Sequence, residues 1–413
     1  MVLLSLQAEG QTIRGVVYEN LTRTKADYLD QQLDINVGDT ISVENISRNE
    51  QYLKDLNLFF NVEHRIDWHE DSSATLCFII DEAHYVYPVV SDITTNNKFN
   101  FSIGVTDINF LGRAQTIGVL YQYYDRHSIK FFQTAPRHKN NRTGHELFIG
   151  KYSTIEPLYF NDESVRFDFD NYHISSALYY WLNRYWKTSL GGMIMYERYK
   201  NNDRAIMFQN ESFEVGDQFD FMKYQVRNTF TYSRINTHFE RRDGLSNHIH
   251  SEVIATPEME EASFVKITND LRYFKSINKR GNLALRNQIG ISTNRNSPFA
   301  PFVVDGFVNV RGSGDRVARG TGLVTFNAEY LHTVLKHKWA FCQLGAFTDI
   351  AYLRPGGAAL AETFKSENSY YYSGLSFRLQ TRILYRAVIR FDYGFNLQDV
   401  SQGGFTVGFN HFF

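Results

Sequence analysis

The stretch ILYRAVIRFDYGFN, residues 383–396, decides the fold, because its two faces differ along its whole length. Every second residue from 383 to 395 is apolar or aromatic. The other face carries charged and amide side chains: Arg386, Arg390, Asp392 and Asn396. In water, a strand with so wide an apolar face would aggregate unless another layer covered it. The charged face does not suit the core of a soluble sandwich. Lipid on one side and a polar lumen on the other would suit both faces.

This alternation begins near residue 98 and continues to the last residues, GFTVGFNHFF, where Phe405, Val407, Phe409 and Phe413 share one side. The chain has 413 residues. At roughly 20 residues for each strand with its connection, the part of the chain that alternates is long enough for on the order of 16 strands. The sequence contains no run of about 18 apolar residues, so no transmembrane helix is predicted. We therefore predict a transmembrane antiparallel β-barrel over residues 91–413. A soluble two-sheet protein is the alternative, because lipid-facing and core-facing aromatic residues look alike in one sequence.

Residues 11–90 have a different periodicity. TIRGVVYE is a candidate strand, and KADYLDQQLDI and VENISRNEQYLKDLNLF have apolar residues at helical spacing. FNVEHRIDW and ATLCFIIDEA alternate like paired strands. In the second helix Ile46, Leu53, Leu56 and Phe59 fall near one face, so we expect them in the core. The segment is predicted to be a small α+β domain of order β-α-α-β-β. Residues 1–10 are compatible with the remnant of a trimmed signal peptide.

Composition excludes several functions. The 43 basic and 45 acidic residues nearly balance, whereas nucleic-acid binding calls for a basic face. Cys77 and Cys342 lie far apart, in strand-like runs, which favours two buried or lipid-facing thiols over a disulfide framework. Two histidine pairs, His248 with His250 and His332 with His337, lack the spacing of metal ligands. The sequence contains no nucleophile elbow and no phosphate-binding loop. We predict no enzyme activity, no metal and no cofactor.

The ordered motifs resemble the BamA/TamA-type outer-membrane assembly and translocation superfamily, also called the surface antigen D15 family. LNLFFNVEHRIDW followed by ATLCFIIDEA resembles the end of a single POTRA domain. TDINFLGRAQTIGVLYQ resembles the first barrel hairpin of the family, and FERRDGLSNHIHSEVIA resembles its mid-barrel segment. VRGSG, residues 310–314, resembles the Val-Arg-Gly-aromatic signature. The chain departs from the family pattern at Ser313, where an aromatic residue is usual, and in having one POTRA domain rather than several.

The resemblance implies that Arg311, between Val310 and Gly312, lies on a long loop folded into the lumen, where it meets acidic groups of the wall. The alternation provides an independent expectation. In LVTFNAEYL the apolar face leaves Glu329 inside, and in FCQLGAFTDIAYL it leaves Asp349 inside. A planar guanidinium suits paired carboxylates better than a lysine does. We therefore predict a loop lock formed by Arg311 with Glu329 and Asp349. An arginine on the surface beside unrelated acids is the alternative.

The resemblance also implies the function. The protein would insert or translocate polypeptides at the bacterial outer membrane, with its POTRA domain in the periplasm. Client chains would add to a sheet edge, at FNVEHRID or at Thr12–Glu19. A weak seam would join the first and last barrel strands, with these residues: Phe99, Phe101, Gly403, Gly404, Gly408 and Phe413. The expected partners are unfolded outer-membrane or secreted polypeptides, outer-membrane lipids, and periplasmic or lipoprotein accessory proteins. A passive pore or receptor barrel is the alternative function.

Overall fold

The computed structural model of the protein falls into two compact units, which are described separately. Unit 1 comprises residues 1–88, 105–118 and 132–146, and unit 2 comprises residues 89–104, 119–131 and 147–413. The described residues are 11–56, 58–71, 73–94, 100–135, 142–160, 163–202, 209–210, 213–214, 218–238, 241–294, 299–337, 340–381, 388–409 and 411–413. The predicted signal-peptide remnant, residues 1–10, therefore lies outside them. No described helix is long and apolar enough to cross a membrane.

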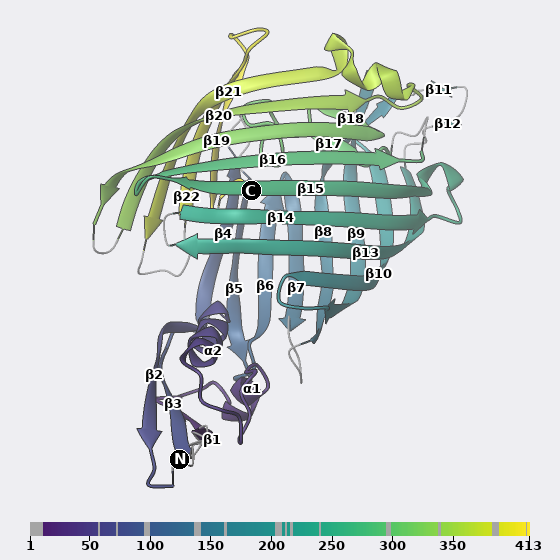
Figure 1. The fold of residues 1–413 in the computed structure, drawn as a ribbon. Helices are drawn as coiled ribbons and strands as arrows, with labels where there is room; N and C mark the ends of the chain where they lie inside the picture. The colour runs from purple at the N-terminus through teal and green to yellow at the C-terminus, as the bar shows by residue number, and fades with distance from the viewer. Residues whose placement is uncertain are drawn as a thin grey trace, which may run out of the picture. The chain divides into compact units, whose positions relative to one another are not determined.

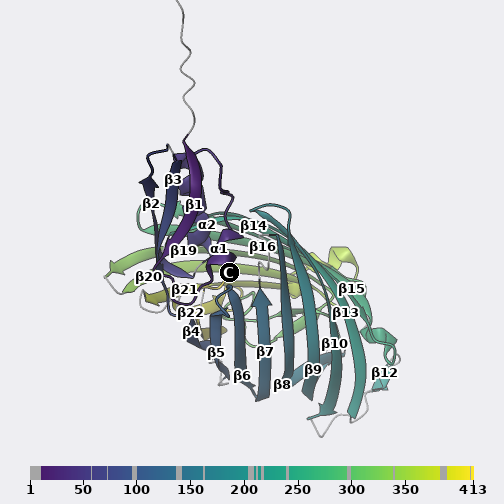
Figure 2. The same cartoon turned by 90° about the horizontal axis from the view of Figure 1, so that it is seen from below.

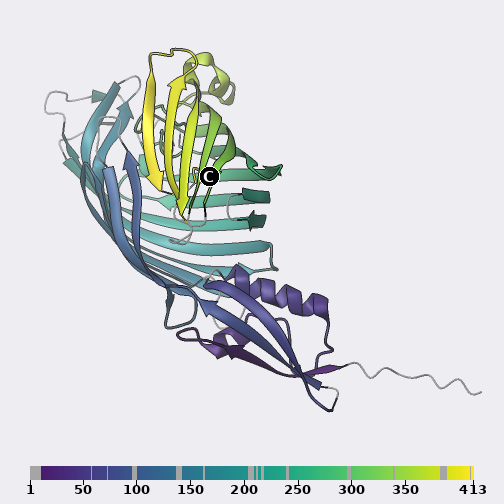
Figure 3. The same ribbon diagram turned by 90° about the vertical axis from the view of Figure 1, so that its left-hand side faces the viewer.

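Unit 1 contains a three-stranded sheet with two helices. Its elements are β1 (Thr12–Glu19), α1 (Ala26–Asp30), α2 (Val43–Asp55), β2 (Phe59–Trp68) and β3 (Ser73–Glu82). The sheet order is β1-β3-β2, with β1 parallel and β2 antiparallel to β3. Helix α2 lies along this sheet (Figure 3) and buries Ile46 and Leu53 against it. The predicted order β-α-α-β-β is confirmed.

Two details of unit 1 differ from the prediction. The first helix is only five residues long and ends at Asp30. The last part of the predicted helix, residues 31–35, is not helical. Phe59 is buried as expected, but it is the first residue of β2 and not part of the helix. Both differences lie at element ends, where periodicity alone does not locate the boundary.

The end of β3 holds the loop before α1 through one carboxylate. Glu82 accepts hydrogen bonds from the backbone N–H groups of Thr22, Arg23 and Thr24, at 3.2, 2.9 and 2.8 Å. It also accepts one from the Thr22 hydroxyl. Burial raises the pKa of Glu82, but these hydrogen bonds outweigh it and lower the pKa to about 2.

Acid should therefore loosen unit 1. The pKa of Glu82 falls from 4.5 to about 2 on folding, so the carboxylate form favours the folded state. Its contribution to stability is expected to be complete above about pH 4.5 and to disappear as the pH falls through about 2. The measurement is the rate at which a pyridyl disulfide labels the buried Cys77 in a Cys342→Ala background. Glu82→Gln should flatten the pH dependence; an equal dependence in both proteins would contradict the prediction.

The larger sheet has sixteen antiparallel strands, as predicted. Their order is β10-β13-β14-β15-β16-β19-β20-β21-β22-β23-β4-β5-β6-β7-β8-β9. Neighbouring strands of this order run side by side, β13 to β22 in Figure 1 and β5 to β10 in Figure 2. The strands are β4 (Val86–Thr94), β5 (Asn100–Phe110), β6 (Gln115–Tyr124), β7 (Arg126–Ala135), β8 (Thr143–Phe160), β9 (Glu163–Trp181), β10 (Trp186–Asn201), β13 (Gln218–His238), β14 (Arg241–Ala255), β15 (Phe264–Ile277), β16 (Gly281–Ser292), β19 (Gly322–Lys336), β20 (Ala340–Arg354), β21 (Ser369–Thr381), β22 (Val388–Asn396) and β23 (Gly403–Phe409).

The two faces of this sheet separate as the alternation predicts. Along β22, Tyr393 is 53% exposed, whereas Arg390 and Asp392 are 3% and 1% exposed. The residues from 382 to 387, which include part of the stretch quoted first, lie outside the described residues. Outward-facing apolar residues on other strands of the sheet are also exposed: Leu178, Leu190, Val226, Val253, Leu344 and Leu375. Buried polar residues facing inward and exposed apolar residues facing outward are the arrangement of a membrane barrel.

The first and last strands of the sheet meet over a short distance. The pairing of β23 with β4 consists of Thr406 with Thr94 and Val407 with Ile93, whereas β22 and β23 pair at seven positions. In the described residues the sheet is therefore not closed along its length. The predicted partner of β23 was the strand of residues 99–107, which is wrong, because β4 precedes it. β4 also starts at Val86, before the predicted start of the barrel at residue 91.

The remaining elements lie between the barrel strands. They are the short strands β11 (Gln209–Asn210), β12 (Phe213–Glu214), β17 (Phe302–Val304) and β18 (Ala318–Gly320), and the 3-10 helices η1 (Glu260–Ala262), η2 (Leu360–Phe364) and η3 (Ser366–Asn368). β17 and β18 pair with each other and form the base of the segment that we call the lumen loop, residues 302–320. This loop carries the predicted site.

Candidate functional site

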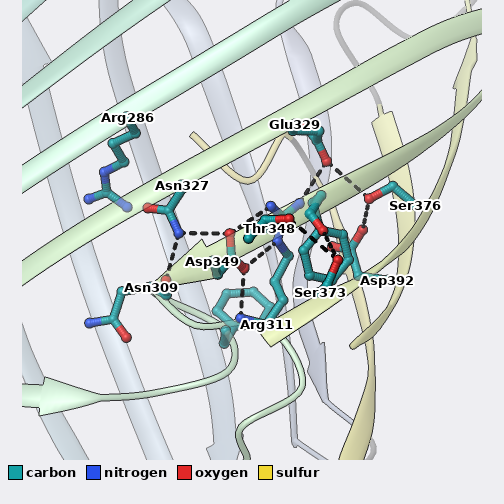
Figure 4. Close-up of polar contacts among 12 residues, drawn as sticks. Arg286, Asn309, Arg311, Asn327, Glu329, Thr348, Asp349, Ser373, Ser376 and Asp392 are labelled. Carbon is teal, nitrogen blue, oxygen red and sulfur yellow. Dashed lines mark hydrogen bonds and ion pairs between the residues drawn. The ribbon is translucent and has the colours of Figure 1, made fainter. Parts of the chain in front are cut away.

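The lumen loop places Arg311 against two strands of the wall. Arg311 is fully buried, and its Nε and Nη2 donate to the two oxygens of Asp349 on β20, both at 2.9 Å. Its Nη1 donates to Glu329 on β19 at 2.7 Å. The backbone N–H of Arg311 also donates to Asp349, at 3.0 Å. Figure 4 shows this side chain between the two carboxylates. The structure thus brings together the arginine and both carboxylates singled out in the sequence.

A second arginine extends this ion-pair network. Arg378 on β21 is fully buried; it donates to Glu329 at 2.6 Å and to Asp392 on β22 at 2.6 Å. Ser376 Oγ lies 3.0 Å from Glu329 and 2.8 Å from Asp392. With Arg390 Nε 3.8 Å from Asp392, three guanidinium groups face three carboxylates, so their formal charges cancel. Buried charges are tolerated when they are paired and hydrogen-bonded, as Arg311 and Arg378 are with these carboxylates.

The wall also holds the loop backbone. Asn327 on β19 donates through Nδ2 to the carbonyl oxygen of Asn309 and to Asp349, both at 2.8 Å. Gly312 has φ +88° and lies so close to β22 that an added Cβ would be 2.5 Å from the carbonyl oxygen of Gly394. Only glycines on both sides allow this approach of two backbones. The close approach of the two backbones therefore requires the glycine of the predicted Val-Arg-Gly motif. Val310 of the same motif is fully buried in the apolar cluster beneath it.

The end of the chain turns into the same site. Residues 411–413 follow β23, and Phe412 lies under Arg311 with its ring centroid 4.2 Å from the guanidinium carbon. Phe347 lies 3.7 Å from it, so Arg311 is sandwiched between two aromatic rings. Phe413 packs with Phe274 and is 7% exposed, and its carbonyl oxygen accepts a hydrogen bond from Arg242 at 2.9 Å. Phe413 was predicted to share one side with Phe405 and to belong to the seam, but it is buried and lies beyond the end of β23.

Of the other predicted seam residues, the three glycines lie on the last strand, as predicted, whereas Phe101 does not lie beside it. Phe99 lies outside the described residues, and Phe101 is on β5, which is not next to β23. Gly403, Gly404 and Gly408 are on β23, where they pair with β22. A Cβ at Gly408 would lie 2.4 Å from Arg390 Nε, so this glycine leaves space for an inward arginine.

The lumen retains a cavity beside the loop. It has a volume of about 780 Å³, and its lining includes Arg316 and Phe307 of the loop and His248, Glu252 and Asp270 of the wall. His250 hydrogen-bonds to Thr229 and Glu252. Among the described residues, no group of His, Cys, Asp and Glu could hold a metal ion.

Some site residues were missed in the sequence although a signal existed. Alternation along SYYYSGLSFRLQT places Ser376 and Arg378 on the inward face together with Tyr372. The position of Phe412 had no such signal, because the alternating pattern continues through the last residues while the chain leaves the sheet.

Comparison with known proteins identifies the family. A model described as the Omp85 superfamily domain matches residues 109–413, which is most of the chain. The chain belongs to the Omp85 superfamily. A second model, the surface antigen variable number repeat of the POTRA type, matches residues 11–83. The resemblance proposed from the sequence, to the BamA/TamA-type superfamily with a POTRA domain before the barrel, is confirmed. No curated protein matches the chain.

Solved structures share the fold of this Omp85 protein at low identity. BamA from Haemophilus ducreyi lacking POTRA domains 1–3 has a TM-score of 0.63 at 13% identity, covering 96% of this chain and 83% of that one. CdiB from Acinetobacter baumannii has a TM-score of 0.62 at 12% identity, covering 97% and 73%. CdiB from Escherichia coli has a TM-score of 0.58 at 11% identity, covering 99% and 92%. Omp85 membership supports polypeptide insertion or translocation at the outer membrane in general.

Proposed function

We propose that this Omp85 protein inserts polypeptides into the bacterial outer membrane or translocates them across it. In this proposal the POTRA unit, residues 11–83, lies in the periplasm, and the lumen loop is locked in the barrel. The observation that carries the proposal is the buried contact of Arg311 with Glu329 and Asp349 in a barrel with a short β23–β4 pairing. A loop held by paired buried charges has one defined position. A barrel with a weak seam can admit a strand from a client at its edge.

The POTRA unit offers two edges for client chains. β1 and β2 are the outer strands of the order β1-β3-β2, so each has one side without a partner strand in this sheet. The outer side of β1 is hydrogen-bonded at its start, where Ile13 N–H donates to Asp39 and Gly38 N–H donates to Ile13, and lacks a partner strand beyond that point. An extended polypeptide could add to either edge by backbone hydrogen bonds, with little sequence preference. The proposed partners are unfolded outer-membrane or secreted polypeptides, with outer-membrane lipids around the barrel and periplasmic or lipoprotein accessory proteins at the POTRA unit. No catalytic step or cofactor is part of the proposal.

Reconstitution tests this proposal directly. In liposomes, the protein is expected to accelerate the folding of an unfolded outer-membrane barrel added from outside, measured by the appearance of protease-resistant, heat-modifiable client. The control is Gly192→Ala on β10, where an added Cβ would meet its nearest atom at 3.5 Å. This variant should retain the acceleration. Steady ion conductance without any acceleration would favour a passive pore and would overturn the proposal.

A further inference from the structure

The lumen loop has a second anchor on another part of the wall. Arg316 Nη1 donates to Glu156 on β8 at 2.7 Å, and Arg319 pairs with the same carboxylate. Arg316 Nη2 also donates to Thr154 at 2.9 Å, and the Tyr159 hydroxyl donates to the carbonyl oxygen of Arg316 at 2.9 Å. Glu156 is 9% exposed. The contact is therefore buried and involves three residues of one strand.

The loop between the two anchors is stiff. The β17–β18 pairing closes its base, and Gly306 N–H donates to the carbonyl oxygen of Gly314 at 2.6 Å across it. The Asp305 side chain accepts from the N–H groups of Phe307, Val308 and Arg316, at 2.8, 3.2 and 3.0 Å. Hydrogen bonds that cross the loop repeatedly restrict its backbone. A displacement at one anchor is therefore transmitted to the other.

The two anchors lie on opposite sides of the sheet order. β8 is eight positions from β20, which holds Asp349, whichever way the sixteen strands are followed. One of these two arcs contains the short β23–β4 pairing. The sheet is continuous along the other arc. A stiff connection between β8 and β20 would therefore limit how far the arc with the seam can spread.

We propose that Glu156 is a positioning residue for the barrel, because it completes a connection across the lumen that keeps the β23–β4 seam from opening. Arg311 holds one end of this connection, and the Arg316 and Arg319 contacts with Glu156 hold the other. Releasing either end removes the restraint. This inference concerns the conformation of the barrel alone and is tested without a client polypeptide.

The test measures single-channel conductance in planar bilayers. Glu156→Gln should raise the open fraction about tenfold, because it removes hydrogen-bonded charge pairs. Arg316→Gln weakens the same anchor from the loop side and should act in the same direction, and it serves if Glu156→Gln does not fold. The matched control is Glu197→Gln, which removes another buried lumen carboxylate paired with Lys223 at 2.8 Å; its conductance should equal that of the wild type. Glu156→Asp keeps the carboxylate, so its open fraction should lie between those of the wild type and Glu156→Gln.

A disulfide across the seam distinguishes conductance through an opened β23–β4 seam from a general loosening of the barrel. Ile93→Cys and Val407→Cys replace residues that are paired across β4 and β23, in a background with Cys77→Ala and Cys342→Ala. Oxidation should abolish the added conductance of Glu156→Gln, and reduction should bring it back. If the conductance of Glu156→Gln equals that of the wild type, or stays high with the seam cross-linked, the proposal is wrong. The same conclusion follows if Glu156→Gln and Arg311→Ala lower the free energy of opening additively in the double variant, since one connection can be released only once.

Discussion

Replacing Arg311 with alanine is expected to release the lumen loop and to abolish the acceleration of client folding. Asp349 would lose both hydrogen bonds from the guanidinium group while remaining in a site where it is fully buried. Breaking a buried ion pair from one side costs about 3–5 kcal/mol. Even the lower value corresponds to a shift of roughly a hundredfold in the docking equilibrium.

Trypsin measures the release, because the loop contains Arg316 and Arg319 as cleavage sites. These bonds should resist cleavage in the wild type and be cut faster in Arg311→Ala, where only the second anchor on Glu156 still holds them. Arg311→Lys keeps the charge but loses the bidentate geometry, so it should be intermediate. Adding Asp349→Ala to Arg311→Ala removes the unpaired carboxylate and should recover stability without recovering activity. Equal protection of the loop in wild type and Arg311→Ala would show that this arginine does not hold it.

Gly394→Ala is expected to displace the loop without changing any charge. The new Cβ would lie 2.4 Å from the carbonyl oxygen of Arg311 and 3.1 Å from the Cα atom of Gly312. Both contacts are with backbone atoms, which cannot rotate away as a side chain would. Overpacking of this kind costs about 1–3 kcal/mol, so the loop or β22 must move.

The same trypsin assay checks this prediction against Gly192→Ala. Gly394→Ala should expose the loop and slow client folding, in the same direction as Arg311→Ala, whereas Gly192→Ala should leave both unchanged. If Gly394→Ala retains a protected loop with full activity, close docking on β22 is not needed for the function. Agreement of a steric and an electrostatic variant would show that loop position matters, rather than lumen charge.

The wall of the site could be predicted because a strand has only two faces. Once Phe326 and Tyr330 are assigned to the outside, Glu329 must point inward, and the same argument places Asp349. The loop arginine came from the resemblance to the family. The sixteen-stranded sheet followed from the same alternation together with the chain length.

The long-range contacts of the lumen could not be predicted. Glu156 and Arg316 are far apart in the sequence, and nothing in the local pattern of either segment specifies that they meet. β4 was missed because VYPVVSDIT contains Pro88, which weakens a strand signal. The inward turn of Phe412 was missed because an aromatic alternation looks the same whether its last residues remain in the sheet or leave it.

The sandwich of Arg311 between Phe347 and Phe412 sets the order of folding events. Every partner of Arg311 in this site comes later in the chain, on β19 and β20 and in the segment after β23. The site therefore cannot be complete until the last strand has been made and paired. Contacts between distant segments form slowly, because the intervening chain must first be ordered. The ion pairs of Arg311 with Glu329 and Asp349 need only β19 and β20, whereas the Phe412 ring can cover Arg311 only after β23 has paired.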